Sequence, residues 1–280
     1  METSAVRQRG EGQARRAANS KAVEMGARAG FVARGILYFL IGLLALQIAF
    51  SDSGGKQADR GGALAEVASK PFGEVVLWLL GVALVGMALW RLSEALFGQA
   101  GQDGGKAGKR LIAAGRFLFY GFVSYSVLSY AAGGQSSGSG SSDRQTDDVT
   151  AKVLDWPGGQ WLVGIAGLVV AGIGIYIAVR ALMRKFHKHL RMSAMSPKVR
   201  RAVDVLGVFG GTARGVVFAT AGCFAVAAAV QHEPGKAKGM DDTLRSFTET
   251  PVGPWLLGLI ALGLVAFGVF SWANARWREV

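Results

Sequence analysis

Six runs of apolar residues alternate along the chain with polar, charged segments. They cover Phe31–Phe50, Val75–Phe97, Leu111–Ala132, Trp161–Met183, Leu206–Val230 and Trp255–Trp272. Each run has the length of about 20 residues that an α-helix needs to cross roughly 30 Å of hydrocarbon. Buried helices of a soluble protein would not recur six times at this length with charges on both sides. The pattern therefore predicts an all-α polytopic membrane protein with six transmembrane helices.

The six predicted helices group into three similar two-helix units. A constant offset of 180 aligns the first unit with the third and places Arg34 on Arg214. An offset of 82 aligns the first helix of the middle unit and places Arg34 on Arg116, and the offset becomes 86 in the second helix. The four additional residues fit the Gly/Ser-rich tract 133–142, which is typical of a flexible linker. This self-similarity indicates internal repeats.

The repeats define the domain organisation. We expect a basic tail over residues 1–27, followed by repeats over 28–98, 99–185 and 186–280. Each repeat contains two spans, so all three begin on the same side of the membrane. They are therefore predicted to be parallel repeats with a pseudo-threefold relation about an axis along the membrane normal.

The loop inside each repeat has the composition of a short amphipathic helix at the membrane surface. Apolar residues follow one another at helical spacing, and a proline and a glycine come after them. Acidic residues that can cap a helix precede the apolar positions: they are Asp59, Asp147, Asp148, Asp241 and Asp242. In the second helix of each repeat, closely spaced glycines predict a face that packs against other helices.

The charge of the chain is strongly positive and unevenly distributed. The formal net charge is +12, and most of the 31 basic residues lie before the first run, between repeats or after the last run. Because positive segments resist translocation, this distribution predicts a multi-pass protein of the cytoplasmic membrane with both termini in the cytoplasm. The basic side would attract anionic lipid headgroups of the bilayer. This placement of the charges argues against a nucleic-acid partner.

Three tandem units carry an Arg…Ala-Arg-Gly…Tyr start and a Pro-x-Gly before a Gly-rich second helix, with departures in the middle and third units. This pattern resembles the bacterial membrane family called domain of unknown function 1206, over nearly everything from Arg28 to Arg276. The resemblance implies the three-repeat architecture and no activity.

The sequence contains no recognisable catalytic or metal site. No Asp or Glu lies in the middle of a predicted span, which argues against a proton-coupled pump. His187 and His189 lie among cations and are expected to belong to a solvated basic loop. A P-loop motif is absent. We therefore expect no enzyme activity, no cofactor and no metal.

One arginine per repeat remains as a candidate: Arg34, Arg116 and Arg214. The simplest interpretation is snorkelling, in which the guanidinium reaches the lipid phosphates at the membrane surface. The alternative is that the three converge at the cytoplasmic end and bind an anion or a lipid headgroup bidentately. The aromatic residues four positions later are expected to be packing residues: Tyr38, Tyr120 and Phe218.

Three classes of function follow. The first is a non-enzymatic structural or partner subunit, associated with another membrane protein or with further copies of itself, and it predicts no polar cavity. The second is a small transporter or channel along the axis between the repeats, with a cavity lined by the three arginines or by Gln47, Tyr125, Thr220 and Asn274. The third, an enzyme acting on lipid, has the least support in the sequence.

Overall fold

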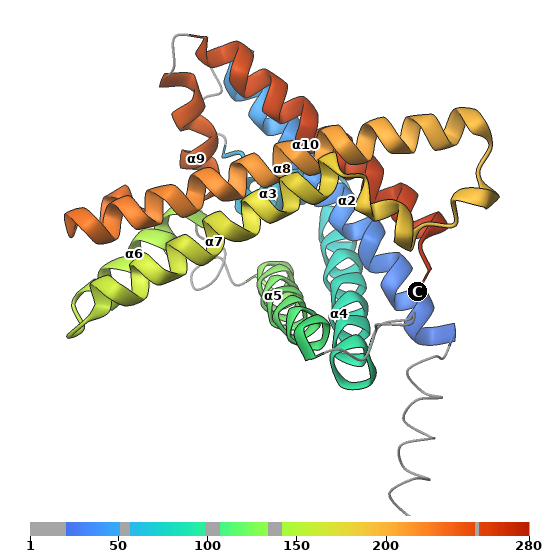
Figure 1. The fold of residues 1–280 in the computed structure, drawn as a ribbon, viewed down its shortest axis with the longest axis horizontal. Helices are drawn as coiled ribbons and strands as arrows, with labels where there is room; N and C mark the ends of the chain where they lie inside the picture. Colours follow the sequence, from blue (N-terminus) through green and yellow to red (C-terminus); the bar gives the residue numbers. More distant parts are fainter. Residues whose placement is uncertain (1–20, 51–56, 99–106, 134–141, 250–251, 280) are drawn as a thin grey trace, which may run out of the picture.

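The computed structural model describes residues 21–50, 57–98, 107–133, 142–249 and 252–279 (Figure 1). Six helices in it are long and apolar enough to cross a membrane. They are α2 (Lys21–Phe50), α4 (Gly73–Phe97), α5 (Ala107–Ala131), α7 (Gly159–Leu182), α8 (Pro197–Gln231) and α10 (Gly253–Trp277). The predicted all-α, six-span architecture is confirmed. The chain is a multi-pass membrane protein.

The helices extend beyond the apolar runs at the end of the molecule where α2 begins and α10 ends. α2 begins at Lys21, so residues 21–27 of the predicted tail form its first turns, and residues 1–20 lie outside the described ranges. α8 begins at Pro197, where the fixed φ of proline suits the first helical position. Hydrophobicity marks only the part of a helix in lipid, whereas Ala, Lys and Arg continue a helix into water.

Short helices occupy the loops inside the repeats, as predicted. They are α3 (Arg60–Ala68), α6 (Ser142–Leu154) and α9 (Met240–Ser246). Asp59 caps α3, because its carboxylate accepts a hydrogen bond of 2.7 Å from the amide of Gly62. The N-cap of α9 is Gly239 rather than an aspartate. Asp241 instead accepts a 2.7 Å bond from the amide of Ala58, which joins the loops of the first and third repeats.

The closest helix packing crosses the boundaries between repeats. α4 packs against α5, α7 against α8, and α10 against α2, so each pair combines the second helix of one repeat with the first helix of another. We call these three pairs the arms of the molecule. They point in different directions in Figure 1, where α7 and α8 run side by side, as do α2 and α10. The last helix of the chain therefore pairs with the first.

Glycines bring the two helices of an arm into backbone contact. A Cβ atom on Gly174 of α7 would lie 2.3 Å from the amide nitrogen of Ala219 in α8. At the equivalent position of the α10–α2 arm, a Cβ on Gly268 would lie 2.8 Å from the carbonyl oxygen of Gly35. Close backbone approach gains dispersion contacts that larger side chains would prevent. These glycines face protein, as predicted.

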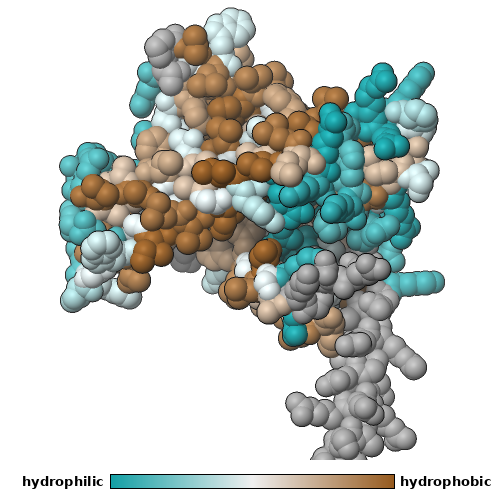
Figure 2. Space-filling model, in the orientation of Figure 1, coloured by the Kyte–Doolittle hydropathy of each residue, from teal (hydrophilic) through white to brown (hydrophobic). Residues whose placement is uncertain are grey.

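Two of the three repeats also hold their own helices together. α2 packs on α4, and α8 packs on α10, whereas α5 and α7 make no comparable contact. The long helices thus form an open series in the order α5, α4, α2, α10, α8, α7. Figure 2 shows a broad band of hydrophobic side chains over the arms, with hydrophilic side chains gathered at either end.

Candidate functional site

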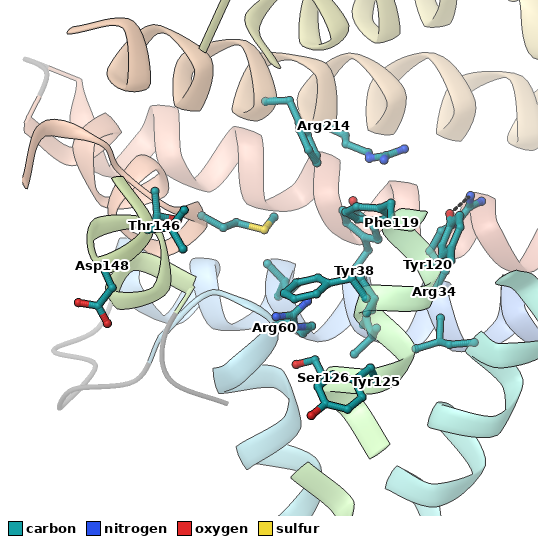
Figure 3. A pocket seen from close by; sticks show the side chains of 18 of the residues that line it. Arg34, Tyr38, Arg60, Phe119, Tyr120, Tyr125, Ser126, Thr146, Asp148 and Arg214 are labelled. Carbon is teal, nitrogen blue, oxygen red and sulfur yellow. Dashed lines mark hydrogen bonds between the residues drawn. The ribbon is translucent and has the colours of Figure 1, made fainter. Parts of the chain in front are cut away.

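A cavity of about 740 Å³ lies where the helix series is open. Its lining comes from α5 on one side, α8 on the other and α2 between them, with contributions from α3, α4, α6 and α9. Most of the lining is apolar, and it includes the arginines of two repeats, Arg34 and Arg214. Figure 3 shows Arg34 and Tyr120 toward one end of the cavity and Thr146 and Asp148 toward the other.

Arg34 is directed into the protein by two hydrogen bonds. Its Nε donates to Ser271 Oγ of α10 at 3.0 Å, and its Nη1 donates to the hydroxyl oxygen of Tyr120 of α5 at 3.3 Å (Figure 3). Its Cζ also lies 4.8 Å from the ring centre of Phe31 and 5.2 Å from that of Phe267. The snorkelling interpretation is therefore wrong for Arg34, because its guanidinium contacts α5 and α10 inside the protein.

Arg214 lies in a cage of aromatic rings. Its Cζ is 4.9 Å from the centre of Phe267, 5.2 Å from that of Phe218 and 5.3 Å from that of Tyr38. Its Nε is buried without a hydrogen-bond partner. Within the described ranges, no carboxylate forms an ion pair with Arg34 or Arg214. The cavity therefore has two positive charges that aromatic faces stabilise only in part.

Arg116 is not in the cavity lining. It lies on α5 within electrostatic range of Arg214, Arg91 and Glu94. Arg91 is only 3% exposed and pairs with Glu94. The structure therefore brings two of the three repeat arginines into one cavity and places the third beside a buried ion pair.

The opposite end of the cavity carries further charges. Arg60, at the start of α3, lies with its Cζ 5.3 Å from the ring centre of Phe122. Burial lowers the pKa of Arg60, and the neighbouring Asp59 carboxylate opposes this effect. Asp148 and Lys152 of α6 complete this end. The cavity is thus cationic near both ends and apolar between them.

Comparison with known proteins accounts for the repeats. The family model described as Domain of Unknown Function (DUF1206) matches residues 29–98, 112–184 and 209–278. The chain belongs to the DUF1206 family. It is 28% identical over 248 residues to "Uncharacterized protein YxxB" of Bacillus subtilis strain 168, covering 87% of both chains. No solved structure gives a significant match.

In this DUF1206 protein the aromatic residues four positions after each arginine have a role that the sequence interpretation missed. The expected packing role is confirmed for Tyr120, which is buried in the hydrophobic core, and for Tyr38, which packs against that core and on Phe267. Together with Phe218, both also line the cavity. A spacing of four places each ring on the same helix face as its arginine, and this repeated pair could have indicated a shared site. Of the polar residues expected to line a transport cavity, the lining includes Tyr125 and omits Gln47, Thr220 and Asn274.

The segment between α7 and α8 is more ordered than the expected solvated loop. His187 lies 2.7 Å from the carboxylate of Asp204, and Arg184 pairs with the same group at 3.1 Å. Burial, followed by the positive charge of Arg278, lowers the pKa of His189 to about 4. This DUF1206 segment therefore folds onto the start of α8 and the end of α10, where the amide of Arg191 donates to the carbonyl of Trp277.

Proposed function

We propose that this DUF1206 protein is a non-enzymatic binding protein that holds an anionic group, such as a phosphate, between Arg34 and Arg214. The observation that carries the proposal is the presence of two guanidinium groups in one cavity without a carboxylate partner among the described residues. The buried, unpaired Nε of Arg214 provides a donor for an additional acceptor.

The energetics favour an anion at this position. An arginine at the centre of a membrane helix costs about 2.5–3.5 kcal/mol on insertion scales. Cation–π contacts return roughly 0.5–2 kcal/mol. A negative charge ~4 Å from a guanidinium would contribute about 4 kcal/mol at an effective dielectric constant of 20. An anion shared by both arginines would therefore stabilise both charges beyond what the aromatic rings and the two hydrogen bonds of Arg34 contribute.

The hydrogen-bonding groups are suited to an oxyanion. Guanidinium groups bind phosphate or carboxylate oxygens through paired N–H donors. Tyr120 accepts a hydrogen bond from Arg34, so its own hydroxyl proton is available to donate to the same anion. The site would thus offer donors from α2, α5 and α8. This is the binding role that the repeat arginines suggested, restricted to two of them.

The other classes of function have less support. The structural-subunit class predicts no polar cavity, and most of the cavity lining is indeed apolar. The two guanidinium groups within that lining favour the binding role. Charge distribution supports a position in the cytoplasmic membrane with both termini in the cytoplasm. The lipid bilayer is then the main partner, and its anionic headgroups are the nearest source of the ligand chemistry.

The test is anion binding by the purified full chain and its arginine variants in detergent. The probes are short-chain phosphatidylglycerol, phosphatidylcholine of the same chain length, and inorganic phosphate. We expect phosphatidylglycerol to bind more tightly than phosphatidylcholine, and Arg34→Gln or Arg214→Gln to weaken this binding about tenfold, the equivalent of 1.4 kcal/mol.

Arg200→Gln is the matched control, because Arg200 lies on α8 with Arg214 but is exposed. It should bind like the parent protein. The proposal would be refuted if Arg34→Gln and Arg214→Gln, at the same folded fraction as the parent, bound phosphatidylglycerol and inorganic phosphate as tightly as the parent does.

A further inference from the structure

We infer that the anion is the headgroup of a membrane phospholipid, which reaches the site sideways from the bilayer through the opening between α5 and α7. This inference rests on the anion-binding function proposed above. It adds the class of ligand and its route, and it excludes a free anion from water as the main ligand.

In the first and third repeats, a glycine at equivalent positions lets the two helices of the repeat cross in contact. In the first repeat, a Cβ on Gly30 of α2 would lie 2.4 Å from the Cβ of Met87 in α4. In the third repeat, a Cβ on Gly210 of α8 would lie 2.4 Å from the backbone nitrogen of Phe267 in α10. The offset of 180 places Gly30 on Gly210 and Met87 on Phe267, so the two contacts are equivalent. The absence of a side chain therefore lets the helices of each repeat cross in contact.

The middle repeat has isoleucine at both equivalent positions. The offsets of 82 and 86 place Ile112 of α5 on Gly30 and Ile173 of α7 on Met87. These isoleucines are 47% and 48% exposed, so neither is buried in a helix crossing. A branched side chain in place of glycine prevents the backbone approach seen in the other repeats. The repeat that stays open is thus the one whose sequence lacks the closing glycine.

A second pair of positions shows the same difference. In the first repeat Gly26 and Gly86 meet, with a Cβ on Gly26 only 3.1 Å from the Cα of Gly86. Their equivalents in the middle repeat are Gly108 and Gly172, and a Cβ on either would meet nothing within 4 Å. The crossing is lost along the helices and not only at one residue.

The wall of the opening is suited to acyl chains. Phe119, Phe122 and Tyr125 line the cavity from α5, and they are 46%, 56% and 68% exposed. α5 is long and apolar enough to cross a membrane, so in a bilayer these exposed rings would face hydrocarbon rather than water. In Figure 2 the surface is recessed between the hydrophobic side chains over α7 and those over α5.

The charges in the cavity select among lipids. The headgroup would lie at Arg34 and Arg214, which attract a negative phosphate, and the chains would leave past the exposed rings of α5. Arg60 and Lys152 line the other end, so cations outnumber the acidic Asp148 in the lining. This complementarity favours an anionic phospholipid over a zwitterionic one.

The experiment maps the acyl chains directly. The full chain, in bilayer nanodiscs containing phosphatidylglycerol with a photoreactive group on one acyl chain, is irradiated, and the labelled peptides are identified by mass spectrometry. We expect specific labelling of α5 around Phe119–Tyr125, competed by unlabelled phosphatidylglycerol and not by equimolar glycerol phosphate. Labelling spread evenly over all lipid-facing helices would overturn the inference.

A variant tests the role of the middle repeat. Ile112→Gly supplies the glycine of the other repeats and is expected to reduce specific labelling at least threefold, because α5 can approach α7. Leu111→Gly is the control, since it adds the same helix-destabilising residue at a neighbouring position that is 75% exposed. Equal labelling of folded Ile112→Gly and the parent would contradict the role assigned to Ile112.

The outcomes separate the two proposals. If inorganic phosphate binds with the expected dependence on Arg34 and Arg214 while α5 is not specifically labelled, the anion site stands and the lateral lipid route is wrong. If the binding of neither phosphatidylglycerol nor inorganic phosphate depends on Arg34 and Arg214, the proposed function itself fails.

Discussion

Replacing Gly174 by alanine should separate two helices that are in backbone contact. The added Cβ would lie 2.3 Å from the amide nitrogen of Ala219 and 2.7 Å from the carbonyl oxygen of Gly215, whereas ordinary contacts begin near 3.4 Å. Both obstacles are backbone atoms, which cannot move without moving α8. Such overpacking costs about 1–3 kcal/mol, and alanine returns roughly 0.5–1 kcal/mol through helix propensity. We expect a net loss of ~1–2 kcal/mol in the free energy of unfolding.

Gly172→Ala is the matched control on the same helix. A Cβ at Gly172 meets nothing within 4 Å, so the substitution has the propensity gain without the clash. The assay is unfolding in mixed micelles at increasing mole fractions of sodium dodecyl sulfate, followed by circular dichroism and tryptophan fluorescence. The reasoning would be refuted if Gly174→Ala were as stable as the parent, or if Gly172→Ala lost as much stability as Gly174→Ala.

Two further predictions concern the ends of the molecule. Asp241→Ala should lower the free energy of unfolding by about 1–3 kcal/mol, because the buried amide of Ala58 would lose its acceptor. Asp241→Asn keeps an acceptor oxygen, so it should lose less stability than Asp241→Ala in the same unfolding assay. Equal losses in the two variants would contradict this prediction. The pKa of His189 is lowered to about 4, so the folded state favours the neutral imidazole. Between pH ~6.5, the ordinary pKa of histidine, and pH ~4, the unfolded state binds a proton at His189 and the folded state does not. The free energy of unfolding is therefore unaffected by His189 above pH ~6.5 and decreases as the pH falls from ~6.5 toward 4. Unfolding measured between pH 7 and 4 should show a shallower pH dependence in His189→Gln, and an unchanged slope would argue against a half-buried His189 that stays neutral in the folded state.

The fold could largely be predicted from hydrophobic periodicity, because the length of an apolar run is set by bilayer thickness. The repeat register also followed from the sequence, since Arg34 and Arg214 hold the same place in their helices. The pairing of helices could not be predicted. In lipid, lipid-facing and protein-facing surfaces of a helix are both apolar, so hydrophobicity does not distinguish them. Glycine positions indicate which face packs against another helix, but they do not indicate which helix that is.

The candidate site was found only in part. Two of the three repeated arginines, Arg34 and Arg214, line the cavity of the proposed site, but the prediction assumed that threefold repetition in sequence means threefold equivalence in space. Arg116 departs from this, because the middle repeat is open and α5 carries it beside Arg91 and Glu94. Ile112 at the position of Gly30 and Gly210 was the readable signal of that asymmetry. From the sequence alone, Ile112 could not be recognised as such a signal, because the helix contacts made at Gly30 and Gly210 are visible only in the structure.

The pairing of the first helix with the last sets a condition on biosynthesis. A ribosome releases α2 long before α10, so Gly35 and Gly42 of α2 remain without their α10 neighbours until the final span enters the membrane. During that interval the nascent chain can form the α4–α5 and α7–α8 arms. Assembly is therefore complete only when α10 enters between α2 and α8 and joins the two halves of the open series. A chain truncated before Gly253 would present the glycine face of α2 to lipid or to the insertion machinery.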